Sequence, residues 1–237
     1  MNPLLLHIET ATEICSVALT KGEQVLATLK SDKGNSHTEN LFPFIEKVFK
    51  ESNRSINELD AVVLSIGPGS YTGLRIGASA AKGICYALNL PLIGISTLQS
   101  IVFGAMNLIN EENILYCPMI DAKRMEVYTA FFNDKGKIIT EVENKIIDEQ
   151  SFVTELKNNI IVFCGNGMPK SKSLIQHKNA RFVETTLLAD NMPKPALEKY
   201  KNNQFEDVAY FEPYYLKEYV AKKSSVTNSI KQSSIVG

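Results

Sequence analysis

The sequence predicts a duplicated α/β fold with two lobes of the βββαβα type, each built on a mixed sheet. Three observations predict it. Strand-like and helix-like segments alternate through the first half, a glycine-rich string joins a strand to a helix, and the second half repeats the opening. With 237 residues, 44% of them hydrophobic and 22% charged, the chain is long enough to bury one large core or two small ones.

Three short apolar runs at the start predict strands. They cover Leu4–Ile8, Ile14–Thr20 and Gln24–Leu29, and a Lys21-Gly22-Glu23 turn joins the last two. These runs form the first three strands of the predicted first sheet.

A helix is predicted next. Ser36 and Glu39 form a Ser-x-x-Glu capping box, which satisfies free backbone N–H groups at a helix start. Pro43 inside this helix predicts a kink or a frayed first turn, and His37 is expected to be exposed in the first turn. The helix has a wide apolar face, formed by Leu41, Phe42, Phe44, Ile45, Val48 and Phe49.

The most informative string is GPGSYTGLRIG at residues 67–77, between the strand-like AVVLSI and a helix predicted from Thr72 to about Leu88. Its glycines permit positive φ and close backbone approach, and the helix start offers N–H groups that can hold a phosphate. A tight turn that lets the helix pack on its sheet explains the same residues equally well. Leu74 after Gly73 excludes a Walker A loop, and the spacing excludes a G-x-S-x-G nucleophile elbow.

A further strand, Pro91–Ile95, and a helix from its predicted cap Ser96 to about Ile109 complete the first half. The polar string that follows sets the expected boundary near residues 108–113. We therefore expect a first lobe over residues 1–110, a second over 111–220 and a flexible Ser- and Lys-rich tail over 221–237.

Four matches in the same order indicate that the second half repeats the first. LLLHIETAT-EICSVAL aligns with LYCPMIDAKRMEVYTAF, and each contains a strand that ends in an acid, Glu9 or Asp121. A Lys-Gly turn follows in both halves, and AVVLSIGPG is echoed by NIIVFCGNG, so the Gly-x-Gly at 67–69 matches that at 165–167. Two such units related by a pseudo-twofold axis form the RNase H-like (actin-like/ASKHA) fold, which holds a nucleotide between its lobes.

That layout places Glu9 and Asp121 facing each other across a cleft. Carboxylates there can bind Mg²⁺ through water or activate a nucleophile, although acids at strand ends also cap turns, and residue type alone favours the capping role. Thr12 and Arg124 are further candidates for lining the cleft. The candidate nucleotide-binding residues are Glu9, Thr10, Gly67, Gly69, Ser70 and Asp121.

Small residues recur along the helix that follows the glycine string. They are Gly69, Gly73, Gly77, Ala80 and Ala81, with Ile84 on a neighbouring face. A glycine inside a helix costs about 1 kcal/mol relative to alanine, so these positions indicate close approach of another helix. The apolar helix at 41–49 can fill that groove within the chain, or both helices can face a second subunit.

Charge and composition exclude several classes of protein. The 25 basic and 26 acidic side chains give a formal charge of −1, whereas a protein that binds nucleic acid by itself carries a basic excess. The four cysteines lie singly in apolar runs and the three histidines are dispersed, so we expect buried thiols, a core His7 and no metal site. Because neither a run of eighteen apolar residues nor a basic leader occurs, we expect a cytoplasmic protein that is neither exported nor embedded in a membrane.

Several longer strings together resemble the bacterial TsaB (YeaZ) family, and the resemblance spans nearly the whole chain. It rests on IETAT with CSVAL at 8–19, SHTE ahead of LFPFI at 36–45, GPGSYTGLRIGASAAKG at 67–83, PLIGISTLQS at 91–100, IDAKRMEVYTAF at 120–131 and PYYLK at 213–217. It implies a subunit of the complex that makes threonylcarbamoyladenosine in tRNA, with tRNA contacted only through that complex. Glu9 departs from the family, because many relatives have Asp there, and this leaves any phosphate or Mg²⁺ role of that strand end open.

The family is paralogous to the catalytic subunit TsaD, in which two histidines after the corresponding helix bind the catalytic metal. Thr97 and Ile101 stand at those positions here, and isoleucine cannot ligate a metal, nor can one threonine hydroxyl replace imidazole ligation. The resemblance therefore implies a non-catalytic scaffold that binds and activates TsaD and helps recruit the ATPase TsaE. Any ATP or ADP with Mg²⁺ is then expected at the interface of the complex.

The resemblance also implies that the two apolar helices form the dimerisation face with TsaD, or with a second copy when the chain is alone. The implied interface residues are Leu41, Phe42, Ile45, Val48, Tyr71, Gly73, Leu74, Gly77, Ala80, Ala81 and Ile84. Two other classes stay open. One is an active actin-fold ATPase or small-molecule kinase that uses Glu9 and Asp121, and the other is a glycoprotease-like metallopeptidase, which the missing ligands disfavour.

Overall fold

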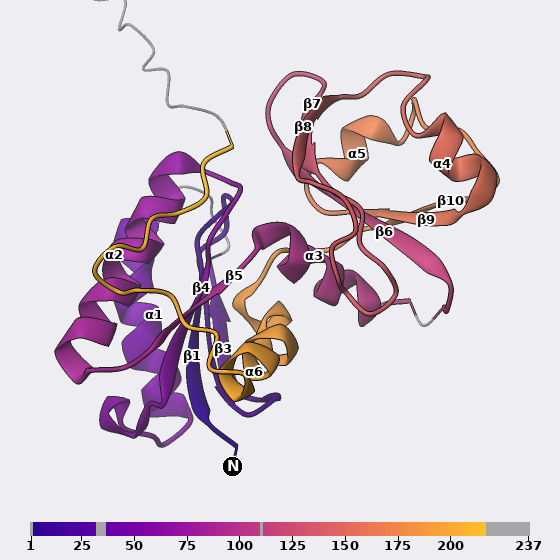
Figure 1. Cartoon of the computed structure of the whole chain (residues 1–237). Coiled ribbons are helices and arrows are strands. Elements are labelled where there is room, and N and C mark those ends of the chain that lie inside the picture. The colour runs from indigo at the N-terminus through magenta and orange to yellow at the C-terminus, as the bar shows by residue number, and fades with distance from the viewer. Residues whose placement is uncertain (1, 32–36, 110, 217–237) are drawn as a thin grey trace, which may run out of the picture.

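The computed structural model of the chain describes residues 2–31, 37–109 and 111–216. Two five-stranded mixed sheets have the strand orders β3-β2-β1-β4-β5 and β10-β9-β6-β7-β8 (Figure 1). Read from its other edge, the second order equals the first with five added to every strand number. The predicted duplicated fold is therefore confirmed in the topology itself.

The first half follows the predicted order of elements. These are β1 (Leu4–Glu9), β2 (Ser16–Lys21), β3 (Gln24–Lys30), α1 (His37–Glu51), the 3₁₀-helix η1 (Ile56–Glu58), β4 (Ala61–Ser65), α2 (Tyr71–Leu88), β5 (Leu92–Ile95) and α3 (Thr97–Met106).

The second half is a reduced copy of the first, because its helices α4 and α5 have only 6 and 4 residues where α1 and α2 have 15 and 18. Its elements are β6 (Ile114–Asp121), β7 (Glu126–Thr129), β8 (Glu143–Ile146), α4 (Val153–Asn158), β9 (Ile160–Cys164), α5 (Met168–Ser171), β10 (Ala180–Val183), the 3₁₀-helix η2 (Ala189–Asn191) and α6 (Pro193–Lys201).

The central strand of each lobe pairs antiparallel on one side and parallel on the other. β1 lies between β2 and β4, and β6 lies between β7 and β9 in the same way. Parallel neighbours end at the same edge of a sheet, so the loops after them meet. The Ser70 N–H donates to the Ala11 carbonyl at 2.7 Å in the first lobe, and the Gly167 N–H donates to the Met119 carbonyl at 2.9 Å in the second.

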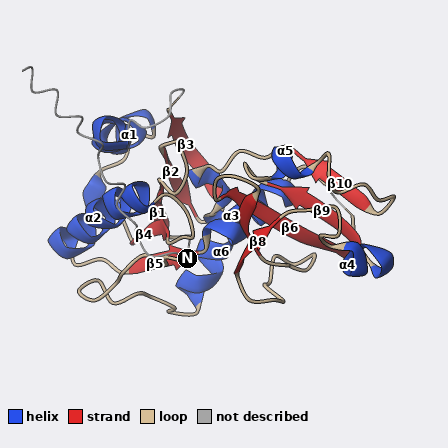
Figure 2. Cartoon of the chain, turned by 90° about the horizontal axis from the view of Figure 1, so that it is seen from above, coloured by secondary structure: helices blue, strands red, loops and turns tan. Residues whose placement is uncertain are grey.

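Helices cover both faces of the first sheet. α1 and α2 pack on one face, and η2 with α6 packs on the other, which explains why all six residues of β1 are buried (Figure 2). α3 packs instead on β6 and β9 of the second sheet. The two sheets lie on either side of the boundary expected near residue 110, but the first core takes η2 and α6 from beyond it and the second takes α3 from before it. The expected tail over 221–237 lies outside the described residues.

Two glycines of α2, Gly73 and Gly77, face Thr10 in the loop after β1. A Cβ atom at Gly73 would overlap the carbonyl oxygen of Thr10, and one at Gly77 would overlap the Thr10 hydroxyl and lie 3.0 Å from Leu64 Cδ1. At Gly73 and Gly77 the small-residue face predicted as a helix groove therefore packs on the loop after β1 and on β4, while Ala80 of the same series lines the space between α1 and α2. Spacing along a helix fixes which residues share a face, but it does not say what covers that face.

His37 corrects another expectation, because it is buried, with 7% of its surface exposed. Its Nε2–H donates to the Thr12 carbonyl at 2.9 Å, and its ring lies 3.3 Å from the position of a Cβ on Gly73. Burial lowers the pKa of His37. Because Gly73 has no side chain, the His37 ring can pack beside it. The two residues are far apart in the sequence, so the local sequence pattern does not reveal this contact.

Smaller differences concern helix ends. α3 ends at Met106 and not near Ile109, and its N-cap Ser96 makes no side-chain capping bond. α1 continues through Pro43. Ser36, and with it the predicted capping box, lies outside the described residues.

The polar and sulfur-containing core residues follow the prediction. All four cysteines are free and buried, and His7 is a fully buried residue whose Nε2 lies 2.8 Å from the Thr20 hydroxyl. Burial lowers the pKa of His7 to about 3, so its ring is neutral at physiological pH.

Candidate functional site

An open groove lies between α1 and α2 and is called the helix groove below. Its volume is about 650 Å³, and it is lined by Thr38, Leu41, Phe42, Tyr71, Thr72, Arg75, Ile76, Ser79 and Ala80. Leu41 and Ala80 form a buried floor, whereas Phe42 is 59% exposed. An apolar groove with an exposed aromatic wall is typical of a protein-docking surface.

The structure divides the implied interface residues into two groups. Leu41, Phe42, Tyr71 and Ala80 line the helix groove. The others are buried within the fold and do not line it; they are Ile45, Val48, Gly73, Leu74, Gly77, Ala81 and Ile84.

One end of the helix groove carries a stack of aromatic and cationic side chains. The Tyr71 and Tyr215 ring centroids lie 4.8 Å apart, and the Arg75 guanidinium carbon lies 4.2 Å from the Tyr71 centroid and 6.0 Å from the Tyr215 centroid. Tyr215 belongs to the segment that follows α6 and runs along α2 (Figure 1). That segment is held by the Tyr214 N–H, which donates to the Ile66 carbonyl at 2.7 Å.

A second cavity, of about 630 Å³, lies between the lobes and is called the interlobe cleft. It is lined by Ala11, Thr12, Glu13, Pro68, Gly69, Ser70, Tyr71, Thr72, Ile120, Asp121, Ala122, Lys123, Tyr128, Asn166, Tyr215 and Leu216. Ser70 caps α2 by accepting from the Gly73 N–H at 3.3 Å. Of the candidate nucleotide-binding residues, Gly69, Ser70 and Asp121 line the cleft, while Glu9, Thr10 and Gly67 do not.

Glu9 is buried inside the first lobe, so it does not face Asp121 across the cleft as expected. Its side chain has no exposed surface, and Oε1 accepts from the Ala11 N–H at 2.7 Å. Burial raises the pKa of Glu9 to about 7, against the opposing effects of the N–H groups of Ala11 and Thr10 and of the Ser65 hydroxyl. Oε2 has no hydrogen-bond partner among the described residues. Glu9 therefore shapes the loop after β1, the turn-capping role that its residue type favoured.

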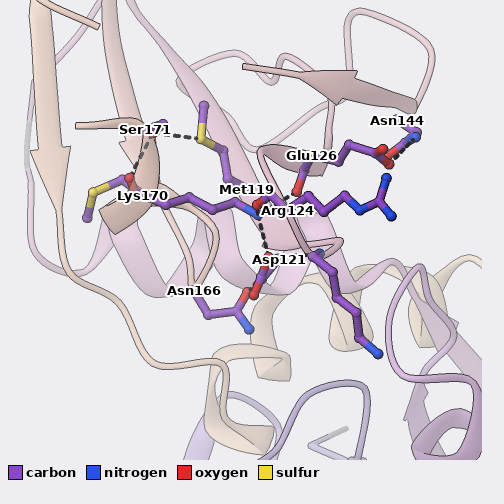
Figure 3. A network of polar contacts seen from close by, with 10 residues as sticks. Met119, Asp121, Arg124, Glu126, Asn144, Asn166, Lys170 and Ser171 are labelled. Carbon is purple, nitrogen blue, oxygen red and sulfur yellow. Dashed lines mark hydrogen bonds and ion pairs between the residues drawn. The ribbon is translucent and has the colours of Figure 1, made fainter. Parts of the chain in front are cut away.

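Asp121 ends β6 at the cleft and is neutralised within the chain (Figure 3). Lys170 of α5 forms an ion pair with its carboxylate and also donates to the carbonyl oxygens of Arg124 at 2.9 Å and Glu126 at 2.6 Å. The Asp121 N–H donates to Asn166 Oδ1 at 3.0 Å. The ammonium group thus occupies the cluster of oxygens in which a cation would bind.

Lys170 also fixes the turn between β6 and β7. Lys123 and Arg124 both have left-handed backbone angles, with φ of 67° and 47°, which is uncommon for residues with side chains. The Lys123 N–H donates to Asp121 Oδ1 at 3.0 Å. This turn brings Lys123 to the interlobe cleft, whereas Arg124, a candidate from the sequence, does not line it.

The two positions compared with the metal-binding histidines of TsaD are occupied by structural side chains. Thr97 Oγ1 accepts from the Gly67 N–H at 3.1 Å and lies 2.8 Å from the Ser65 hydroxyl. Ile101 is buried, with 1% exposed. The second lobe repeats the first contact, because Thr185 Oγ1 accepts from the Gly165 N–H at 2.9 Å. Thr97 is therefore part of the duplicated architecture.

Neither a metal-binding cluster nor a membrane-spanning helix is found in the described part of the chain. No group of three or more His, Cys, Asp or Glu side chains within it is placed to hold a metal ion. None of its helices combines the length and the apolar character that crossing a bilayer requires.

Sequence reasoning missed Arg75, Tyr215 and Lys170 as site residues. Arg75 and Tyr215 are 140 positions apart, and Lys170 is 49 positions from Asp121. The string PYYLK at 213–217, one of those that resemble the TsaB family, was the only signal for the segment that contains Tyr215. No sequence signal identified Lys170.

Comparison with known proteins defines the class first. The family model for TsaD, tRNA N6-adenosine threonylcarbamoyltransferase, matches residues 30–236. An activator of 2-hydroxyisocaproyl-CoA dehydratase from Clostridium difficile, solved with bound ADPNP, superposes with a TM-score of 0.51 at 12% identity over 85% of this chain and 97% of that one. The class is a duplicated actin-like protein related to TsaD.

More similar relatives define the family. The tRNA threonylcarbamoyladenosine biosynthesis protein TsaB of Escherichia coli is 30% identical over 92% of this chain and 96% of its own length. That of Haemophilus influenzae is 38% identical over 54% of this chain and 52% of its own length. YeaZ from Pseudomonas aeruginosa superposes with a TM-score of 0.76 at 24% identity, covering 90% of this chain and all of that one. The chain belongs to the TsaB (YeaZ) family.

Proposed function

We propose that this chain is the non-catalytic scaffold subunit of a complex that synthesises threonylcarbamoyladenosine in tRNA. In this proposal it binds and activates a TsaD-like catalytic subunit through the helix groove and helps a TsaE-like ATPase to engage. It meets tRNA only through the complex, and the same surface allows a homodimer when the chain is alone.

The observation that carries the proposal is the helix groove. Phe42 is exposed over 59% of its surface beside a floor of buried apolar side chains. Apolar surface of this kind gains stability when a partner covers it, by about 25 cal/mol per Å². Thr97 is hydrogen-bonded to the Gly67 N–H, and Ile101 is buried in the core. These two side chains further support a subunit without a TsaD-type metal centre.

We expect Phe42→Glu to weaken binding to the TsaD-like subunit of the same organism by about 30-fold or more, because a charge would be buried in the apolar groove. Affinity is measured by calorimetry. In parallel, threonylcarbamoyladenosine in tRNA is measured by mass spectrometry in cells depleted of the native protein and supplied with the variant. The modification should be lost.

The matched control is Ile146→Glu, which places the same charge on an exposed residue of β8 in the second lobe. It should bind and support modification like the wild type. Normal modification in cells depleted of the protein altogether would overturn the proposed function. Wild-type affinity of a folded Phe42→Glu protein would show that the helix groove is not the docking surface.

The second candidate function, an actin-fold ATPase or small-molecule kinase, has the interlobe cleft in its favour. The residues present do not fit its Mg²⁺, because Glu9 is enclosed and Asp121 is paired with Lys170. We therefore place any nucleotide at the interface of the complex. The purified chain is expected to hydrolyse ATP no faster than background in a coupled assay with Mg²⁺. Steady hydrolysis that disappears in Asp121→Ala would favour the enzyme instead.

A further inference from the structure

Arg75 carries the charge in the lining of the helix groove. Of the nine residues that line the helix groove, Arg75 is the only one with a charged side chain. It is exposed at the rim, while the floor and the opposite wall are apolar. A partner that fills the groove therefore buries apolar surface and meets one positive charge.

The guanidinium is held in place before any partner arrives. It lies 4.2 Å from the centre of the Tyr71 ring, and its Nε–H donates to the Tyr215 hydroxyl at 3.4 Å. Stacking on aromatic faces is a typical arginine contact, and it lowers the entropy that the side chain loses on binding. Only Nε is used in this way.

The two terminal amino groups of Arg75 have no hydrogen bond or ion pair with any described residue. The hydrogen bond to the Tyr215 hydroxyl is the main cause that raises the pKa of Arg75, and Glu212 adds to it without forming an ion pair with Arg75. Two other cations among the described residues are engaged. Arg54 pairs with Glu58, and Lys82 donates to two backbone carbonyls.

A fixed guanidinium with a free edge is suited to a planar, bidentate partner, and carboxylate has that geometry. We propose that Arg75 recognises a carboxylate side chain of the TsaD-like subunit, which lies beside an apolar helix face that fills the helix groove. This inference rests on the proposed function and names the polar contact that sets the register of docking. Covering the groove would exclude water from the pair, which strengthens its dependence on charge.

The test compares Arg75→Glu, Arg75→Ala and Arg75→Lys by calorimetry against the TsaD-like subunit, at low and high salt. We expect at least about 30-fold weaker binding for Arg75→Glu and a smaller loss of affinity for Arg75→Ala. Arg75→Lys should lose part of the affinity, because it keeps the charge but not the bidentate geometry of the guanidinium. Lys137→Glu, an exposed lysine of the second lobe, makes the same change of charge and should have no effect. Thermal unfolding shows whether each variant is folded.

A charge-swap experiment identifies the carboxylate. Hydrogen exchange first maps the surface of the TsaD-like subunit that this chain protects. Each Asp and Glu on that surface is then changed to Lys, one at a time. One of these Lys variants should bind the Arg75→Glu protein at least about 10-fold more tightly than the unmodified TsaD-like subunit binds it. If no such variant exists, or if Arg75→Glu binds like the wild type, the inference is wrong.

The outcomes separate this inference from the proposed function. If Arg75→Glu binds with wild-type affinity and Phe42→Glu loses affinity, the helix groove is still supported as the docking surface and only the proposed carboxylate contact is wrong. Wild-type affinity of both variants removes the docking surface as well. If Arg75→Glu changes only self-association, measured by analytical ultracentrifugation, the carboxylate belongs to a second copy of the chain and the proposed TsaD-like partner is wrong.

Discussion

Gly73→Ala is expected to destabilise the native state by about 3 kcal/mol or more, a large fraction of the stability of a typical domain. The added methyl group would overlap the carbonyl oxygen of Thr10 and approach the His37 ring at 3.3 Å. A backbone oxygen in the buried loop directly after the central strand cannot rotate away as a side chain can. Urea unfolding followed by far-UV circular dichroism measures the change.

Gly83→Ala is the matched control, since it makes the same substitution in the same helix. A Cβ atom there meets nothing within 4 Å, so the variant should be more stable by about 0.5–1 kcal/mol through helix propensity alone. Equal effects of the two substitutions would show that α2 does not pack on β1 as described. Because Gly77 also faces Thr10, and Leu64 of β4 as well, enlarging it tests folding and not docking.

Glu9→Gln is expected to raise stability at pH 8 by about 3 kcal/mol and to leave it nearly unchanged at pH 4.5. Burial raises the pKa of Glu9 from 4.5 to about 7. A carboxyl whose pKa is raised on folding favours the native state while it is protonated, and that stability is lost as pH rises from about 4.5 through about 7. Glutamine removes the charge and keeps an acceptor for the Ala11 N–H.

The measurement must be a difference between variants, because His7 acts in the opposite direction. Its pKa falls from 6.5 to about 3 on folding, so it removes stability as pH falls below 6.5. Urea unfolding of wild type and Glu9→Gln at pH 4.5, 6, 7 and 8 cancels this contribution. Glu13→Gln, an exposed acid of the same loop, should stay within about 0.5 kcal/mol at every pH. A pH-independent difference for Glu9→Gln would contradict the burial of a titrating carboxyl.

Local patterns in the sequence were sufficient for the elements and their order. The string at 67–77 predicted a helix from Thr72 to about Leu88, and α2 runs from Tyr71 to Leu88. The repeated strand, acid and Gly-x-Gly strings predicted the duplication, which the two strand orders confirm. These signals are readable because backbone conformation depends on neighbours a few residues away.

The candidate sites were harder to predict. The small-residue spacing of α2 correctly indicated close approach, but it was assigned to another helix, whereas Thr10 of the loop after β1 is the neighbour at Gly73 and Gly77. Glu9 and Asp121 occupy equivalent positions in the repeat, yet one is enclosed and the other is paired with a lysine. Equivalent positions in a duplicated fold need not have equivalent surroundings.

By itself, the sequence determined the α/β class, the duplication, the glycine turn, the buried cysteines and the family. Only the tertiary structure decided which lobe each helix serves, that Lys170 neutralises Asp121, and that Tyr71, Arg75 and Tyr215 meet at the end of the helix groove. The physical reason is distance along the chain. Secondary structure follows from local periodicity, but ion pairs and stacks join side chains 49 and 140 positions apart, and only the packed fold brings those together.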